Sequence, residues 1–181
     1  MSICDLESLK STIQTGWQPE YLFFWGHTAK DARIGKHVLS QWWPAAFYID
    51  SHRYPTAEHY MMAEKAKLFG DEQALTAILA SESPSKAKAL GRKVRNFDEQ
   101  IWSSHRFDIA VRGNTEKFEQ NTALRAWLLS TADRVLVEAS PRDKIWGIGL
   151  GAEDERALDP KTWRGLNLLG FALMRTRTAL Q

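Results

Sequence analysis

The sequence has little cysteine, little net charge and no long apolar run, and each shortage excludes a class of protein. Cys4 is the only cysteine in 181 residues, so no disulfide can form within the chain and a reducing compartment is expected. The formal net charge of +2 is too small to predict a nucleic-acid-binding surface. No segment reaches the ~18 apolar residues of a transmembrane helix, and the first residues do not resemble a signal peptide. We therefore expect a cytoplasmic protein that does not enter a membrane.

The size of the chain fits one domain, and its tryptophan content is high. At 20.7 kDa we expect a single domain over 1–181, with a helical N-terminal extension at 1–18 and a core at 19–181. The sequence contains eight tryptophans. Tryptophan fills cores and also stacks on planar rings, so the tryptophans are candidates for both tasks.

Apolar periodicity, capping residues and turn residues predict more helix than strand. Helices are predicted over 5–14, 56–69, 83–91 and 167–179, with two more that begin at Asp98 and Asn121. Strands are predicted over 21–25, 46–49 and 135–137, and a turn over 50–52. The strands and helices do not alternate regularly, which argues against a doubly wound sheet. The fold class predicted is α+β, a single helix-rich domain around a small β-sheet.

The predicted helix 56–69 carries the first candidates for chemistry. Glu58 and Lys65 are seven positions apart, so they share a helix face that Met61 and Met62 also line. A carboxylate and an ammonium beside apolar side chains are candidates for shifted pKa values and acid–base catalysis. The same spacing is also typical of a solvated helix edge. His59 has no second histidine or cysteine at ligand spacing, so we expect no metal, and no motif predicts a cofactor.

A second candidate is the loop after the predicted strand 135–137. Asp143 is a possible second carboxylate and Trp146 a possible stacking wall, because polar loops at strand ends often carry function. The alternative is a simple turn with Asp143 exposed and Trp146 in the core. The glycines at 147, 149 and 151 do not follow the dinucleotide-binding fingerprint.

The segment 83–97 is basic and contains no glutamate or aspartate. Arg92 and Arg95 follow the predicted helix stop at Gly91 and are candidates for binding a phosphate, which matches the guanidinium fork. An ordinary solvated basic face is the alternative.

Several separated motifs together strongly resemble the YbiA-like (NADAR) family. The resemblance runs from about 21 to 180 and rests on Phe24-Trp25-Gly26, Leu39-Ser40-Gln41-Trp42-Trp43-Pro44, Glu58-His59-Tyr60 to Lys65-Ala66, Gly91-Arg92, Trp102, Arg112-Gly113-Asn114 through Lys117-Phe118, Glu138-Ala139-Ser140 to Trp146-Gly147 and Asn167-Leu168-Leu169-Gly170. The sequence departs from the family pattern at Gln41, where asparagine is common, and at Glu64, where glutamine is common.

The resemblance implies an N-glycosidase that cleaves the bond between ribose C1 and an exocyclic amine. The implied substrates are ribosylaminopyrimidine phosphates of riboflavin synthesis or guanine carrying ADP-ribose, with modified DNA or RNA as a further possible partner. The resemblance implies active-site roles for Glu58, Lys65, Asp143, Trp102 and Trp146. We also expect substrate contacts from Trp25, Ser40 and Asn167, which belong to the matching motifs, and from Arg92 and Arg95. A non-catalytic ADP-ribose or nucleotide-binding module is the alternative.

Two mechanisms are compatible with these residues. A glycosylamine can open to an imine that a neutral Lys65 captures as a Schiff base, or a carboxylate can activate water against a closed ring. Both require that Glu58, Lys65 and Asp143 meet around one tryptophan-walled hollow, which is the central expectation from the sequence.

Overall fold

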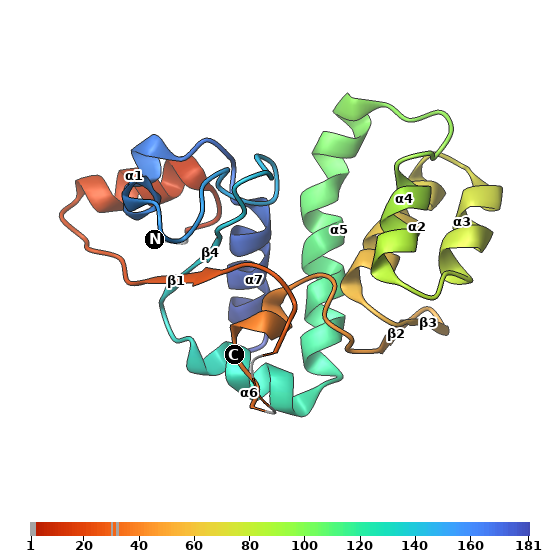
Figure 1. The fold of residues 1–181 in the computed structure, drawn as a ribbon, viewed down its shortest axis with the longest axis horizontal. Coiled ribbons are helices and arrows are strands. Elements are labelled where there is room, and N and C mark those ends of the chain that lie inside the picture. Colours follow the sequence, from red (N-terminus) through yellow and green to blue (C-terminus); the bar gives the residue numbers. More distant parts are fainter. Residues whose placement is uncertain (1–2, 30, 32) are drawn as a thin grey trace. The chain divides into compact units, whose positions relative to one another are not determined.

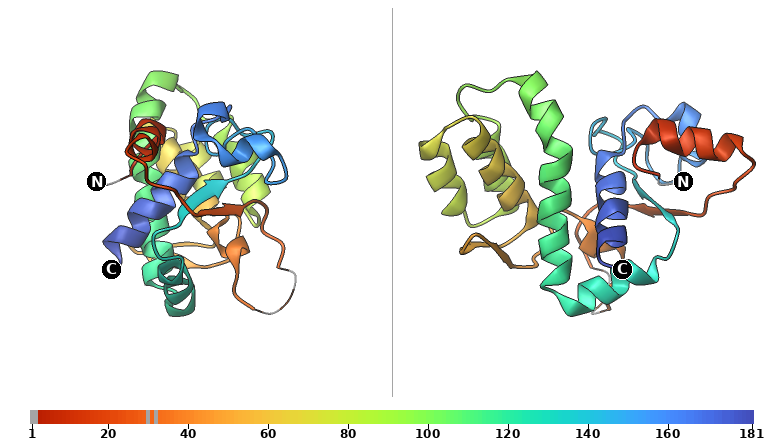
Figure 2. Two further views of the ribbon diagram at one scale, coloured as in Figure 1. Left: turned by 90° about the vertical axis from the view of Figure 1, so that its left-hand side faces the viewer. Right: turned by 180° about the vertical axis from the view of Figure 1, so that it is seen from behind.

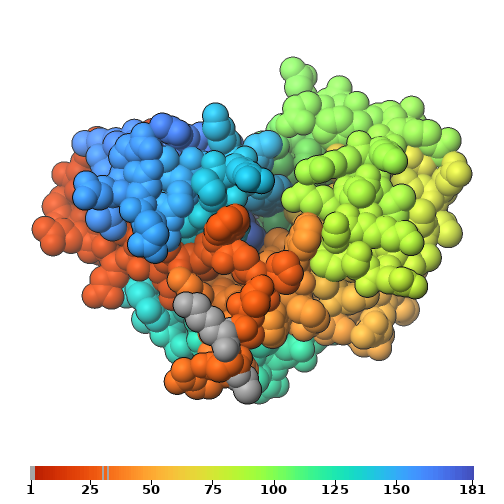
Figure 3. Space-filling model, viewed as in Figure 1, coloured from red at the N-terminus to blue at the C-terminus, as the bar shows by residue number. Residues whose placement is uncertain are grey.

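The residues of the chain group into two compact units. A computed structural model describes residues 3–29, 31 and 33–181. The terminal unit comprises Met1–Ser40 and Ala123–Gln181, and the central unit comprises Gln41–Thr122. In the space-filling view the central unit runs from orange to green, whereas the terminal unit has the red end and the blue end of the colour range (Figure 3). The single domain expected from the sequence stays a prediction.

The terminal unit is built on a parallel pair of strands. β1 (Tyr21–Phe24) pairs with β4 (Val135–Glu138), and both strands can be followed in the left view (Figure 2). Tyr21 is opposite Val135 and Phe24 is opposite Glu138. The first three residues of β4 are buried, and α7 (Leu168–Ala179) packs against this strand. The remaining elements of this unit are α1 (Leu6–Gln14), most of α6 (Thr122–Ser130), and the 3-10 turns η1 (Lys36–Leu39), η2 (Glu155–Leu158) and η3 (Pro160–Thr162).

The central unit begins with a β-hairpin. β2 (Phe47–Ile49) and β3 (His52–Tyr54) are antiparallel, and Asp50 and Ser51 form the turn between them with φ of 49° and 66°. Two central residues with positive φ give the tight turn that suits the twist of a hairpin. The predicted turn is confirmed at Asp50 and Ser51, whereas His52 already belongs to β3, which the sequence analysis did not predict.

Four helices complete the central unit, with α2 in contact with the other three (Figure 1). They are α2 (Ala57–Leu68), α3 (Glu72–Leu79), α4 (Pro84–Gly91) and α5 (Glu99–Glu119). A Cβ at Gly91 would overlap the Met62 side chain, and one at Gly113 would overlap the Tyr60 ring. These two glycines therefore let α4 and α5 approach α2 closely.

The predicted α+β class is confirmed, with two corrections. The small sheet is two separate two-stranded sheets among the described residues, and α3 was not predicted. The signal for α3 was Asp71, whose side chain accepts a hydrogen bond from the backbone N–H of Ala74 at 3.1 Å as a helix N-cap. Gly91 is the last residue of α4 and Arg92 the C-cap, so the helix ends at the predicted residue. Within 3–29, 31 and 33–181, no helix has the length and apolarity that crossing a bilayer requires.

Candidate active site

The first turns of α2 bury the candidate carboxylate. Thr56 caps the helix, and Glu58 in the first turn is only 2% exposed. The backbone N–H of Glu58 donates to the carbonyl of Gln41 at 3.0 Å, which ties the helix start to the segment before β2. A solvated helix edge is therefore excluded for Glu58. Met61 and Met62 on the next turn are also buried, as the proposed apolar stripe requires.

His59, beside Glu58, has a structural task. Its Nε2 lies 3.2 Å from the carbonyl oxygen of Ser81, and its Nδ1 lies 2.8 Å from the Thr56 hydroxyl. Because a carbonyl can only accept, Nε2 carries the proton and Nδ1 accepts from the hydroxyl. Burial lowers the pKa of His59, which favours this neutral form. No cluster of three or more potential metal ligands occurs in the described part of the chain.

A pair of side-chain amides joins α5 to Gln41, the residue whose backbone carbonyl accepts from Glu58 at the start of α2. The Gln41 Nε2 donates to Asn114 Oδ1 at 2.9 Å, and Asn114 Nδ2 donates back to Gln41 Oε1 at 3.2 Å. Asn114 Nδ2 also donates to the carbonyl of Ala110 at 2.8 Å, and both amide side chains are buried. Gln41, one of the departures from the family pattern, thus has buried hydrogen bonds through both its amide nitrogen and its amide oxygen.

Lys65, two turns after Glu58, lies between aromatic rings. Its Nζ is 4.0 Å from the centroid of the Phe97 ring and 5.5 Å from that of Trp102. Burial lowers the pKa of Lys65, whereas the nearby carboxylate of Glu99 opposes this shift. A lysine with a lowered pKa has a larger fraction of free amine near neutral pH, which is the form that acts as a nucleophile.

The structure brings Trp102 to Lys65 and adds an aromatic that the sequence analysis missed. Trp102 is buried on α5, whereas Phe97, just before that helix, is 42% exposed. Phe69 supports Phe97 in an edge-to-face contact with the ring centroids 5.3 Å apart. No short motif marks Phe97, because its significance depends on contact with a lysine more than thirty positions away.

The two arginines predicted to bind phosphate differ in their surroundings. Arg92 is exposed at the end of α4. Arg95 is also exposed, but its Nη2 lies 2.7 Å from Asp71 Oδ1 and its backbone N–H donates to Asp71 Oδ2 at 2.9 Å. These bonds hold the pKa of Asp71 well below its usual range and fix the cap of α3. Arg95 would have to share its guanidinium to bind a phosphate.

In the terminal unit, the loop of Asp143 and Trp146 is held by the aspartate itself. Asp143 Oδ1 accepts from the backbone N–H groups of Ile145 at 2.9 Å and Trp146 at 2.8 Å. Both Asp143 and Trp146 are half-buried, so neither the fully exposed turn nor the core tryptophan of the alternative prediction is found. One carboxylate oxygen fixes the loop, and Oδ2 is the oxygen left for other tasks.

Asn167 has a structural role. It is fully buried with a left-handed backbone at φ 53°, and its side chain bonds the edge of β4. Nδ2 donates to the Leu136 carbonyl at 3.0 Å, and Oδ1 accepts from the Glu138 N–H at 2.9 Å. These bonds support the end of β4, and a substrate contact of Asn167 stays a prediction.

The last two expected substrate contacts also lie in the terminal unit. Trp25 follows β1 and is 62% exposed, so its ring is accessible to a ligand. Ser40 is half-buried at the end of η1, where its backbone N–H donates to the His37 carbonyl at 3.2 Å. Their roles stay predictions.

Two buried cations on α5 were not recognised from the sequence. Lys117 is fully buried, and burial lowers its pKa to about 7. Arg106 is 9% exposed, and its Nε is buried without a hydrogen-bond partner. Charged residues are rarely buried, and only the packing of the fold reveals which ones are.

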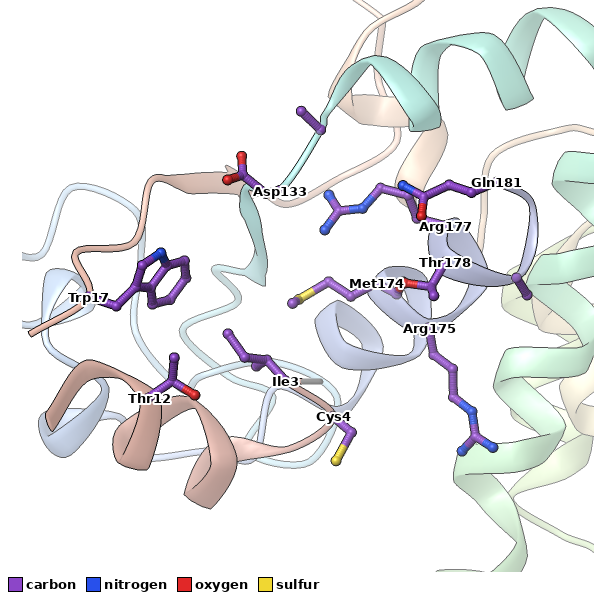
Figure 4. A pocket seen from close by; sticks show the side chains of 12 residues that line it. Ile3, Cys4, Thr12, Trp17, Asp133, Met174, Arg175, Arg177, Thr178 and Gln181 are labelled. Atoms are coloured by element: carbon purple, nitrogen blue, oxygen red, sulfur yellow. The ribbon is translucent and has the colours of Figure 1, made fainter. Parts of the chain in front are cut away.

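A hollow of about 1090 Å³ in the terminal unit is lined by none of the predicted site residues (Figure 4). The side chains of Trp17, Met174 and Arg177 line it, from the segment after α1 and from α7. The residues that line this hollow include no lysine. The candidate active site is therefore the one formed by α2 and α5, where Glu58 and Lys65 lie.

The chain belongs to the NADAR domain family, whose model matches residues 23–181. Among its relatives, the N-glycosidase R617 of Acanthamoeba polyphaga mimivirus is 46% identical over 163 residues, which cover 87% of this chain and 95% of that protein. The N-glycosidase YbiA of Escherichia coli strain K12 is 34% identical over 138 residues, 76% of each chain.

A plant protein and a solved structure are also similar to this chain. The chloroplastic riboflavin biosynthesis protein PYRR of Zea mays is 36% identical over 138 residues, which cover 72% of this chain but 20% of that protein. The NMR structure of E. coli YbiA superimposes with a TM-score of 0.70 at 29% identity, covering 91% of this chain and 86% of that one.

Proposed function

We propose that this protein is an N-glycosidase that hydrolyses the bond between ribose C1 and an exocyclic amine of a nucleobase-like group. The names of the viral and bacterial relatives support the reaction class. The observation that carries the proposal is the position of Lys65: its amine has a lowered pKa and lies against two aromatic rings, on the same helix as the buried Glu58.

In the proposed reaction Lys65 is the nucleophile. The exocyclic nitrogen donates its electron pair as the bond between C1 and the ring oxygen breaks, which leaves an open-chain imine. The free amine of Lys65 adds to C1, and the departing amine takes a proton and leaves with the electrons of its bond to C1. Water then adds to the Lys65 imine, and its breakdown releases the sugar and restores the amine. The balance is one water consumed for one free amine and one free sugar.

The other site residues are assigned by charge and shape. Glu58 transfers the protons between the leaving amine, the sugar and water, because it is the buried carboxylate on the helix of the nucleophile. Trp102 stacks on the planar leaving group. Asp143 and Trp146 belong to the terminal unit, and their roles in the reaction stay predictions from the sequence. The competing mechanism keeps the ring closed and uses a carboxylate to activate water.

Ribosylaminopyrimidine phosphate is the first candidate substrate, and the name of the maize relative supports this choice. ADP-ribosylated guanine is the second, because its ribose is also attached through an exocyclic amine. Mass spectrometry of the products after incubation with each compound tests the proposal. We expect release of the free amine from at least one of them, and absence of product from both would refute the proposed function.

Two matched variants separate an enzyme from a module that only binds nucleotides. Glu58→Gln keeps the shape of the side chain but removes the proton-transferring carboxylate, and should lower turnover by about 10²-fold or more while ligand binding persists. Lys65→Gln should abolish the imine route. If both variants bind ligand as the unmodified protein does, and that protein releases no amine, the protein is a binding module. A steep salt dependence of binding to modified DNA would favour a nucleic-acid substrate.

A further inference from the structure

Arg106 is a buried cation whose hydrogen-bonding capacity is incompletely used. Its side chain is 11% exposed, and its Nε is buried without a partner. A guanidinium offers five donors in a planar fork, and leaving a donor unpaired in a buried position is costly. Such a group needs a reason to be there, and an anionic ligand is one.

Within the described residues, the only ion pair of Arg106 is with the exposed side chain of Glu99. Arg106 Nη1 lies 3.2 Å from Glu99 Oε1, and the side chain of Glu99 is 62% exposed. The same oxygen lies 3.4 Å from the Ser103 hydroxyl, a long contact. Ion pairs of this kind contribute little, so an incoming anion could replace the carboxylate at small cost.

The location of Arg106 connects it to the nucleophile. Trp102 and Arg106 are four residues apart on α5 and therefore share a face, about one helical turn or ~5.4 Å apart along the axis. Trp102 is the ring that lies 5.5 Å from Lys65 Nζ. Glu99 forms an ion pair with Arg106, and its negative charge also favours the charged form of Lys65.

We propose that Arg106 binds the phosphate attached to the ribose of the substrate, in exchange for Glu99. This inference rests on the proposed function for the identity of the sugar. With C1 held at Lys65 beside Trp102, the 5-phosphate of the same ribose extends away from the Lys65 amine, and Arg106 is the buried cation about one helical turn beyond Trp102 on α5. The fork can then donate two parallel hydrogen bonds to phosphate oxygens. The same chemistry serves a monophosphate or the diphosphate of an ADP-ribosyl group.

Calorimetric titration with unreactive probes tests this subsite without any turnover. Methyl riboside 5-phosphate cannot open to an aldehyde, so it cannot react with Lys65, and methyl riboside is the uncharged control. ADP is the diphosphate probe. The variants are Arg106→Gln, Arg106→Lys, Glu99→Gln and, as a matched control on the same helix, Arg112→Gln, whose arginine pairs with Asp50 at 3.2 Å. Thermal unfolding of each variant checks that it is folded.

We expect the unmodified protein to bind the phosphorylated riboside at least tenfold more tightly than methyl riboside, which is the usual contribution of a charge-assisted hydrogen bond. Arg106→Gln should remove this preference, and Arg106→Lys should keep part of it because the charge remains. Glu99→Gln should strengthen binding of the phosphate, and this gain should vanish in the double variant with Arg106→Gln. Arg112→Gln should leave the preference unchanged.

Three results would overturn the inference: an unchanged phosphate preference in Arg106→Gln, an equal loss in Arg112→Gln, or a loss that occurs in Arg92→Gln instead. If Arg106→Gln does not fold, Arg106→Lys and Glu99→Gln decide, and no effect from either refutes the subsite. Tighter binding of ADP than of the riboside phosphate would assign the subsite to a diphosphate, and the reverse to a monophosphate. The proposed function fails independently, by an absence of amine release.

Discussion

Replacing Phe97 by leucine should lower the pKa of Lys65, because the ammonium loses an aromatic ring that stabilises its charge. Leucine keeps an apolar wall next to the amine but removes the π face that lies 4.0 Å from Nζ. A cation–π contact near the surface contributes ~0.5–1 kcal/mol to the charged form, and 1.36 kcal/mol corresponds to one pH unit, so losing it lowers the pKa of Lys65 by about 0.4–0.7. Phe97 is 42% exposed, which places this contact in the weaker range.

The assay is the pH dependence of kcat/KM, which reports groups of the free enzyme. In the proposed mechanism the reaction requires the neutral amine of Lys65, so the rate should rise with pH through the pKa of Lys65 and then level off. In Phe97→Leu the midpoint of this rise should move to lower pH by about 0.4–0.7. Phe97→Tyr keeps a ring at the same position and should leave the midpoint unchanged.

A midpoint that stays in place or moves to higher pH in Phe97→Leu would refute this reasoning. An equal shift in Phe97→Tyr would refute it too, because the effect would then follow from disturbed packing. Glu99→Gln provides an independent check of sign: removing the negative charge that favours the ammonium should also move the midpoint to lower pH.

Three further predictions concern stability, each measured by denaturant unfolding. The pKa of Lys117 is about 7 in the folded protein and ~10.4 in the unfolded chain. Between these pH values the unfolded chain binds one proton more than the folded protein. The free energy of unfolding should therefore rise with pH from 7 to about 10, by at most ~1.4 kcal/mol per pH unit. Lys117→Met should flatten this dependence, and an unchanged slope would contradict the assignment. Asn167→Ala should cost about 2–3 kcal/mol, because the edge of β4 loses two hydrogen bonds and alanine disfavours a φ of 53°. Gly113→Ala should destabilise by about 1–3 kcal/mol through overlap with the Tyr60 ring, whereas Gly151→Ala, where a Cβ meets open space, should be nearly neutral.

The elements that could be predicted are those whose signals are local. Thr56, Ser83 and Asp98 each precede a helix that the structure contains, because a capping side chain satisfies backbone groups only a few residues away. β3 was missed because His52 and Arg53 are polar and exposed, which leaves Tyr54 as its only apolar residue, and α3 was missed because its cap, Asp71, was not recognised.

The site was partly predictable for the same reason. Glu58 and Lys65 lie on one helix, so helical spacing was enough to pair them. The environment of Lys65 depends on Phe97 and Trp102, and that of Arg95 on Asp71, which are contacts between residues far apart in the sequence. For Asn167 the family motif indicates ligand binding, and only the fold reveals that its side chain also bonds the backbone of β4.

The identity of the nucleophile is tested most directly by borohydride trapping during turnover, followed by peptide mass spectrometry. Reduction of a Lys65 imine would leave the sugar permanently attached to that residue, and no labelled peptide is expected from Lys65→Arg. We predict one sugar per chain on the peptide that contains Lys65, formed only when substrate and borohydride are present together. Active enzyme that turns over substrate with no label on Lys65 would contradict the account and leave direct attack by water.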